Sequence, residues 1–115
     1  GASGSAKGKD IANFACRYVG NPYVAGGTSL TNGADCSGFT FAIYKEFGIS
    51  LPRTSTAQRG AGREVSLSDA QPGDIVCYAG HVAIYIGGGR IVHASTPSTG
   101  IKYGNVIVFL IHGLT

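Results

Sequence analysis

The residue best suited to covalent chemistry in this chain is Cys36, which follows Asp35 and precedes Ser37 and Gly38. The residues after it have helical spacing, so its thiol is expected in the first turn of a helix. Unpaired backbone N–H groups and the helix dipole favour a negative charge at that place. The thiolate that they favour is the nucleophilic form of cysteine. Taken alone, the same feature also fits a buried structural cysteine.

A thiolate nucleophile needs a general base, and His81 and His93 are the candidates. Each lies in a Val- and Ile-rich segment, and the glycines at 87–89 separate the two segments. If these glycines form a three-residue hairpin loop, Ile86 pairs with Arg90 and both histidines fall on one sheet face. A two-residue loop would place them on opposite faces. On one face, His81 would exchange the proton and His93 would orient its ring.

The opposite face of the same two segments is apolar. Val82, Ile84, Ile86 and Val92 would face the core. An ordinary strand histidine is the alternative for His81 or His93 taken singly. The joint pattern with a thiol at a helix start favours the catalytic interpretation, and His112 is interpreted as structural.

Helices are expected in the first half of the chain. The apolar spacing predicts helices over 11–19, with Asp10 as N-cap, and over 36–47, with Asp35 as N-cap. Thr54 is expected to cap a short helical piece. The Gly-rich residues between the two long helices predict a loop.

Strands are expected in the second half, after a turn at 71–74. They cover 74–79, 81–86, 90–95 and 105–111. Helices followed by an antiparallel meander define the α+β class.

The composition indicates one compact domain. The chain has 115 residues, of which 43% are hydrophobic and 13% charged, so disorder is not expected. No apolar run is long enough to span a membrane. The net charge of +3 is too small, and the basic residues are too scattered along the chain, to indicate nucleic-acid binding. Residues 1–8 are interpreted as a linker or cloning scar before a domain at 9–115, which suggests a domain taken from a longer protein.

The other two cysteines, Cys16 and Cys77, are interpreted as buried free thiols. The three cysteine positions fit no zinc motif. A disulfide between Cys16 and Cys77 stays open, because the sequence does not give their geometry.

Several motifs together resemble the NlpC/p60 cell-wall cysteine peptidases, over about residues 10 to 111. The matching segments are Asp35–Phe39, Gln71–Val76, His81–Gly87, Ile91–Ala94, Asn21–Gly27 and Leu51–Ser55. The resemblance implies a small papain-like α+β fold, with the helix of the nucleophile packed on an antiparallel sheet or half-barrel. It also implies cleavage of peptidoglycan stem peptides, between γ-D-glutamate and meso-diaminopimelate or lysine. No metal or cofactor is expected.

Carried over residue by residue, the resemblance implies a Cys-His-His triad of Cys36, His81 and His93 that works through a thioester. Tyr23 would line the oxyanion site. The residues that would contact the stem peptide are Asp35, Ser37 and Ser55, with Arg53 binding a carboxylate or serving as an ordinary surface arginine. Many relatives have an aromatic residue where this chain has Ala25, so the groove is expected to differ there.

The resemblance further implies a secreted or cell-wall location, with other domains in the full-length protein. A monomer acting on peptidoglycan or a muropeptide fragment is expected. Two other functions fit the same residues: a thiol acyltransferase or amidase on a non-wall substrate, and a non-catalytic wall-binding module.

Overall fold

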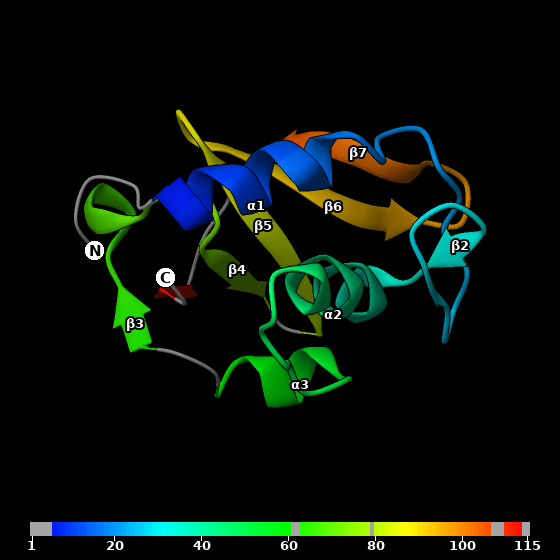
Figure 1. Ribbon diagram of the computed structural model, residues 1–115, viewed down its shortest axis with the longest axis horizontal. Helices are drawn as coiled ribbons and strands as arrows, with labels where there is room; N and C mark the ends of the chain where they lie inside the picture. The colour runs from blue at the N-terminus through cyan, green and yellow to red at the C-terminus, as the bar shows by residue number, and fades with distance from the viewer. Residues whose placement is uncertain (1–5, 61–62, 79, 107–109, 114–115) are drawn as a thin grey trace.

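Two helices lie over one face of an antiparallel sheet in the computed structural model, which describes residues 6–60, 63–78, 80–106 and 110–113 (Figure 1). The helices are α1 (Ala6–Cys16), α2 (Cys36–Glu46) and the short α3 (Ser55–Gln58). The sheet strands are β3 (Arg63–Val65), β4 (Ile75–Tyr78), β5 (His81–Gly87), β6 (Arg90–Thr96), β7 (Gly100–Asn105) and β8 (Leu110–Gly113). This arrangement confirms the α+β class. No helix among the described residues is long and apolar enough to cross a membrane.

The six strands of this sheet follow the order β3-β8-β4-β5-β6-β7, and every neighbouring pair is antiparallel. The meander is confirmed for β4 to β6, and it continues into β7, which the sequence did not predict. The single strand predicted over 105–111 is wrong, because β7 ends at Asn105 and β8 begins at Leu110 on the other side of β4. There β8 pairs with both β3 and β4, so its backbone has partners on both edges. Its side chains, including that of His112, lie outside the described part of the structure.

The first helix begins earlier than the sequence predicts. It starts at Ala6, so Asp10 lies inside it and the predicted N-cap is wrong. A side chain at Gly73 would meet the backbone of Gly8, so the first turn of α1 packs closely on the turn that precedes β4. This contact adds tertiary packing to a Gly- and Lys-containing segment that the sequence did not predict as helical. The interpretation of residues 1–8 as a linker or cloning scar stays a prediction, and the last three of these residues belong to α1.

The two other predicted caps are confirmed. Oδ1 of Asp35 accepts a hydrogen bond from the backbone N–H of Gly38 at 2.7 Å, and α2 begins at Cys36. Oγ1 of Thr54 accepts from the N–H of Ala57 at 3.2 Å and begins α3. Caps are local devices, which is why the sequence predicts them well.

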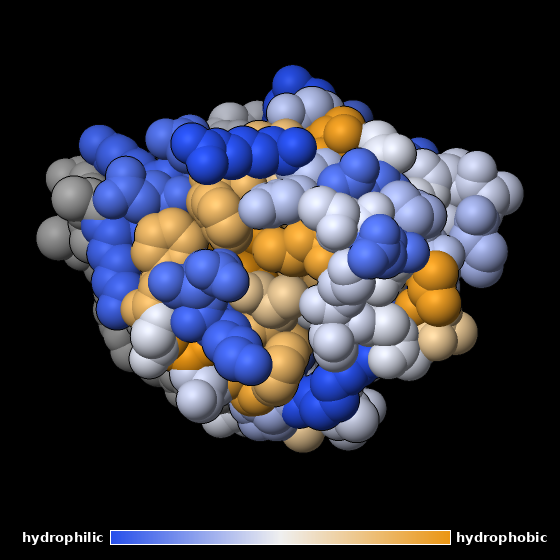
Figure 2. Space-filling view, turned by 45° about the vertical axis from the view of Figure 1, so that its right-hand side comes forward, coloured by the Kyte–Doolittle hydropathy of each residue, from blue (hydrophilic) through white to orange (hydrophobic). Residues whose placement is uncertain are grey.

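The core has two parts, one on each face of the sheet. Helices α1 and α2 cover the larger part, which contains Phe39, Ile43, Val82, Ile84 and Val92, all fully buried. Burial of each such side chain contributes about 1.5–3 kcal/mol. The smaller part, on the opposite face, consists of Val76, Ala83, Tyr85 and Ile91. On the outer surface, Figure 2 shows apolar side chains in the middle of one face, crossed by hydrophilic ones.

The β5–β6 hairpin has a different loop from the predicted one, but His81 and His93 still lie on the same face of the sheet. Gly87 pairs with Arg90, so the loop has two residues instead of three. All three glycines at 87–89 have positive φ, as a type I′ loop and a glycine bulge require. The bulge between Tyr85 and Gly87 restores the register, so Tyr85 pairs with Ile91. The expected Ile86–Arg90 pair is therefore wrong, but the inner parts of the strands pair as predicted.

Candidate active site

The first turn of α2 packs against the glycine-rich loop that precedes it. The loop is held by a short hairpin of β1 (Thr28–Ser29) and β2 (Gly33–Ala34), which the sequence does not predict. Cys36 is the first residue of α2 and is only 8% exposed. A side chain at Gly38 would collide with the carbonyl oxygen of Gly27. The missing side chain at Gly38 therefore makes room for the backbone of the glycine-rich loop.

Arg53 connects the segment before α3 to this first turn. Its guanidinium donates to Oγ of Ser37 at 2.8 Å and to the carbonyl of Gly27 at 3.3 Å. It also forms an ion pair with Asp35 at 3.0 Å. The interpretation of Arg53 as an ordinary surface arginine is wrong, because its donors hold the loop and the helix start together.

The carboxylate of Asp35 accepts hydrogen bonds from the loop before α2, from the first turn of α2 and from Arg53. Besides the cap to Gly38, Oδ2 accepts from the N–H of Gly26 at 2.9 Å and from Arg53 at 3.1 Å. Burial by itself would raise the pKa of Asp35, but these hydrogen bonds outweigh it and lower the pKa below its usual value. Asp35 is therefore a fixed negative charge beside Cys36.

Tyr23 lies close enough to this charge to respond to it. Burial raises the pKa of Tyr23, and negative charge on Cys36 and on Asp35 raises it further. The phenol therefore keeps its proton and is available as a hydrogen-bond donor near Cys36. Ser55 begins α3, and its hydroxyl has no hydrogen-bond partner among the described residues.

Gln58 is a site-supporting residue that the sequence analysis missed. It is fully buried in α3, and its Nε2 donates to the carbonyls of Ser37 at 3.0 Å and Pro52 at 2.9 Å. Its Oε1 accepts from Thr40 at 2.6 Å. Nothing in the polar sequence of this short helix marks Gln58 as buried. The sequence carries one signal for Gln58: it follows the predicted N-cap Thr54 by about one helical turn.

The two predicted partner histidines are in direct contact, as expected from the register. Nε2 of His81 lies 2.8 Å from Nδ1 of His93, and the rings meet edge to face with centroids 5.0 Å apart. Burial lowers the pKa of His81. Burial, His81 and Lys102 lower the pKa of His93 to about 4. Both rings are therefore neutral near neutral pH.

The thiol and the histidine pair approach each other from different faces of the sheet. Cys36 packs in the core part that contains Val82 and Val92, the chain neighbours of the two histidines. The imidazoles point to the opposite face, as strand alternation requires. Within the described residues, no hydrogen bond joins Cys36 to His81. His81 is the first residue of β5 and therefore lies at the end of that strand.

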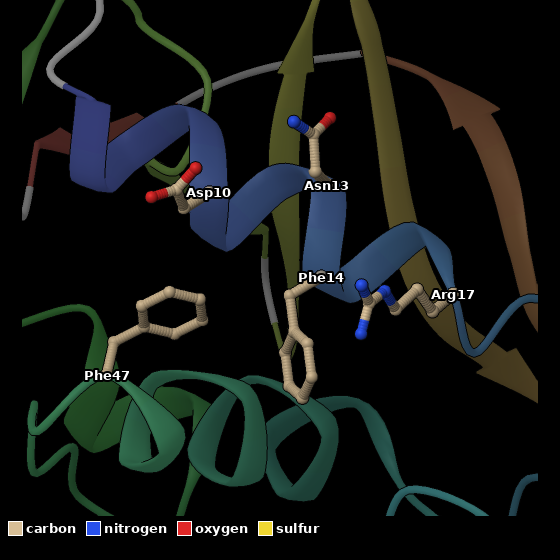
Figure 3. A pocket seen from close by; sticks show the side chains of 5 residues that line it. All are labelled: Asp10, Asn13, Phe14, Arg17 and Phe47. Atoms are coloured by element: carbon tan, nitrogen blue, oxygen red, sulfur yellow. The ribbon is translucent and has the colours of Figure 1, made fainter.

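Several hollows lie on the described surface, and two of them bear on the location of the site. One, of about 270 Å³, includes the histidine pair and is lined by Tyr78, His81, Ile91, His93, Gly104 and Asn105. The other, of about 390 Å³, lies between α1 and the end of α2, where Phe14 and Phe47 meet edge to face (Figure 3). Its rim carries Asp10, Asn13 and Arg17, and it lies at the opposite end of α2 from Cys36. No predicted site residue lines it.

The two remaining cysteines are both free thiols. Burial raises the pKa of Cys77 to about 11, against a smaller opposing effect of Arg59. Cys16 is half-buried in α1. In the part of the chain that the structure describes, no group of three or more His, Cys, Asp or Glu side chains is placed to hold a metal ion.

The site and the fold can be compared with known proteins. The model of the NlpC/P60 family matches residues 20–108, which include Tyr23, Cys36, His81 and His93. The chain belongs to the NlpC/P60 family. Family membership confirms the resemblance on which the site residues were chosen, and the roles of those residues stay predictions.

Individual relatives agree with this NlpC/P60 assignment. The chain is 44% identical over 101 residues to a probable endopeptidase of Corynebacterium glutamicum, covering 85% of this chain and 48% of that protein. It is 42% identical over 95 residues to the probable endopeptidase p60 of Listeria seeligeri, covering 78% of this chain and 18% of that protein. The chain thus spans half or less of these curated relatives.

Solved structures agree with the fold. The NlpC/p60 domain of the peptidoglycan hydrolase SagA matches with a TM-score of 0.85 at 34% identity, over 93% of this chain and 98% of that one. The peptidoglycan hydrolase RipB of Mycobacterium tuberculosis matches with a TM-score of 0.80 at 28% identity, over 95% of this chain and 67% of that one. These matches confirm that the chain has the fold of an NlpC/p60 domain.

Proposed function

We propose that this NlpC/P60 domain is a cysteine endopeptidase that cleaves stem-peptide amide bonds of peptidoglycan. The bond is the one between γ-D-glutamate and a diamino acid. Cys36 is the nucleophile, His81 the general base and acid, and His93 the residue that orients His81. The proposal includes a secreted or cell-wall location and further domains in the full-length protein.

The observation that carries this proposal is the hydrogen bond between Nε2 of His81 and Nδ1 of His93. It occupies one nitrogen of His81 and leaves Nδ1 for the thiol. A base must present a lone pair, so the proton of His81 resides on Nε2 and is donated to His93. His93 then holds the ring and the tautomer, which is the task of the third member of a triad.

The reaction proceeds by acyl transfer. His81 takes the proton of Cys36, and the thiolate attacks the scissile carbonyl carbon. The oxyanion accepts hydrogen bonds from the N–H of Cys36 and from Tyr23, and one such donor contributes about 3 kcal/mol. The C–N bond breaks, and protonated His81 gives its proton to the leaving amine. Water activated by His81 then hydrolyses the thioester and regenerates the thiol.

The residues around Cys36 divide into two proposed roles. Ser37, Ser55 and Asp35 contact the amino end of the stem peptide. Arg53 positions the first turn of α2, because three of its hydrogen bonds go to Asp35, Ser37 and Gly27. Contact of Arg53 with a substrate carboxylate stays a prediction.

Digestion of defined muropeptides with mass analysis of the products tests the proposal. Hydrolysis gives a free carboxylate and a free amine, and the product masses sum to the substrate mass plus one water. A transferred acyl group would instead identify a thiol acyltransferase. The absence of any product, with the muropeptide still bound, would identify a wall-binding module.

A further inference from the structure

The second ring nitrogen of His93 faces an apolar hollow that no step of the proposed mechanism uses. A Cβ atom at Gly104 would lie 3.2 Å from Nε2 of His93, so the absence of a side chain there leaves this nitrogen accessible. Tyr78 and Ile91 form the apolar wall of the same hollow. Its volume of about 270 Å³ is enough for the end of one side chain.

The position of one proton makes this nitrogen a donor. This step rests on the proposed function, in which Nδ1 of His81 is the base and Nε2–H of His81 donates to Nδ1 of His93. Neutral His93 has a single N–H, which must then be on Nε2. Among the described residues, nothing accepts a hydrogen bond from it. The hollow, which is mostly apolar and also lined by Asn105, therefore presents the Nε2–H of His93 as a directed donor.

A positive charge lies beside this donor. Lys102 pairs with His93 in the β6–β7 register, so the two side chains share a face of the sheet. The charge of Lys102 contributes to the lowered pKa of His93. No Asp or Glu lines the hollow. A donor, a nearby ammonium and an apolar wall together suit a carboxylate at the end of an aliphatic chain.

The distance between the His93 donor and Nδ1 of His81 decides which carboxylate of a substrate can reach the donor. The donor is separated from Nδ1 of His81 by the widths of two imidazole rings and the hydrogen bond between them. A carboxylate on the carbon next to the leaving amine is too close to that amine to reach it. A carboxylate at the far end of the diamino acid side chain can reach it.

We propose that this hollow binds the side-chain carboxylate of a diamino dicarboxylic acid on the leaving-amine side of the cleaved bond. The carboxylate accepts the Nε2–H of His93, with Lys102 as the neighbouring cation. The domain therefore prefers meso-diaminopimelate stem peptides over lysine stem peptides, because the lysine side chain has no carboxylate.

The test is a comparison of kcat/KM for two muropeptides that differ only in meso-diaminopimelate or L-lysine. The preference for the diaminopimelate peptide is expected to be about tenfold or more. Lys102→Gln should reduce that preference about fivefold, as loss of one exposed charge partner. Arg90→Gln is the matched control, because Arg90 lies over the Tyr103 ring on the opposite face of the same strands and should leave the preference unchanged.

The outcomes separate this inference from the proposed function. Equal cleavage of both peptides, or a preference that Lys102→Gln does not change, would overturn the carboxylate site and leave the peptidase intact. Cleavage of neither peptide would instead contradict the proposed function. Binding of the diaminopimelate tripeptide to the Cys36→Ala variant, followed by NMR of the histidine ring nitrogens, then tests the hollow directly. Unchanged His93 Nε2 signals there would overturn the site.

Discussion

Nε2 of His81 and Nδ1 of His93 are 2.8 Å apart, and this contact leaves Nδ1 as the nitrogen of His81 that is proposed to act on the thiol. Replacing His81 by Ala should reduce kcat by about a thousandfold or more, since the base and acid are both lost. His93→Ala should cost about a hundredfold, because only the orientation of His81 is lost.

His93→Asn provides the control for that comparison. Its amide oxygen can accept the same proton from His81, so it should recover part of the activity that His93→Ala loses. Steady-state cleavage of one muropeptide by the three variants measures this. Equal losses for the Ala and Asn variants would mean that His93 does not orient His81 through an accepted hydrogen bond.

Loss of Arg53 should affect catalysis more than stability. In Arg53→Met, the first turn of α2 loses its link to Gly27 and Ser37, and a small displacement of the thiol should lower kcat about tenfold. The guanidinium is partly exposed, so the free energy of unfolding should fall by only about 1 kcal/mol. Arg17→Met, which removes an exposed arginine over the Phe14 ring, is the control and should change neither quantity. Unchanged kcat in Arg53→Met would contradict its positioning role.

Gln58 should be essential for the stability of the contact between α3 and α2. Gln58→Leu keeps the approximate volume but leaves the carbonyls of Ser37 and Pro52 without their side-chain donor. The free energy of unfolding should fall by about 2–3 kcal/mol, measured by urea denaturation. Thr56→Ala, at an exposed position of the same helix, should change it by less than about 0.5 kcal/mol. Equal effects of the two substitutions would argue against the buried network.

The histidine pair should make the fold sensitive to mild acid. The folded-state pKa of each ring lies below the ordinary value of about 6.5, so the unfolded chain takes up protons first as the pH falls. The stability from the neutral rings is complete above about pH 6.5 and is lost progressively towards about pH 4. His93→Gln should weaken this dependence when unfolding is measured between about pH 7 and pH 5. An identical loss of stability in both proteins would show that another group is responsible.

The sequence predicted correctly those features that depend on residues close together in the chain, such as helix N-caps and strand alternation. Asp35 and Thr54 were correct as caps because an N-cap depends on residues within one turn. The shared face of His81 and His93 was correct because strand alternation depends only on register. The loop between them was wrong in length, and the bulge at Gly87 compensated for the difference.

Features that depend on contacts between distant segments were not predicted. The return of β8 to the side of β4 depends on pairing between distant strands, and a run of apolar residues does not specify it. Arg53 and Gln58 act on Ser37, more than fifteen residues away in the sequence. Residue types and spacing, together with the family resemblance, selected Cys36, His81 and His93 as candidates, but did not show that Arg53 and Gln58 bind the first turn of α2.

Cleavage of one defined muropeptide by Cys36→Ala, beside Cys16→Ala, tests the central claim most directly. Both variants remove one thiol from a helix, but only Cys36 is in the first turn of α2. Cys36→Ala should have no detectable turnover and an unfolding transition close to that of the parent chain, whereas Cys16→Ala should retain activity. Substantial cleavage by folded Cys36→Ala would contradict the assignment of Cys36 as the nucleophile.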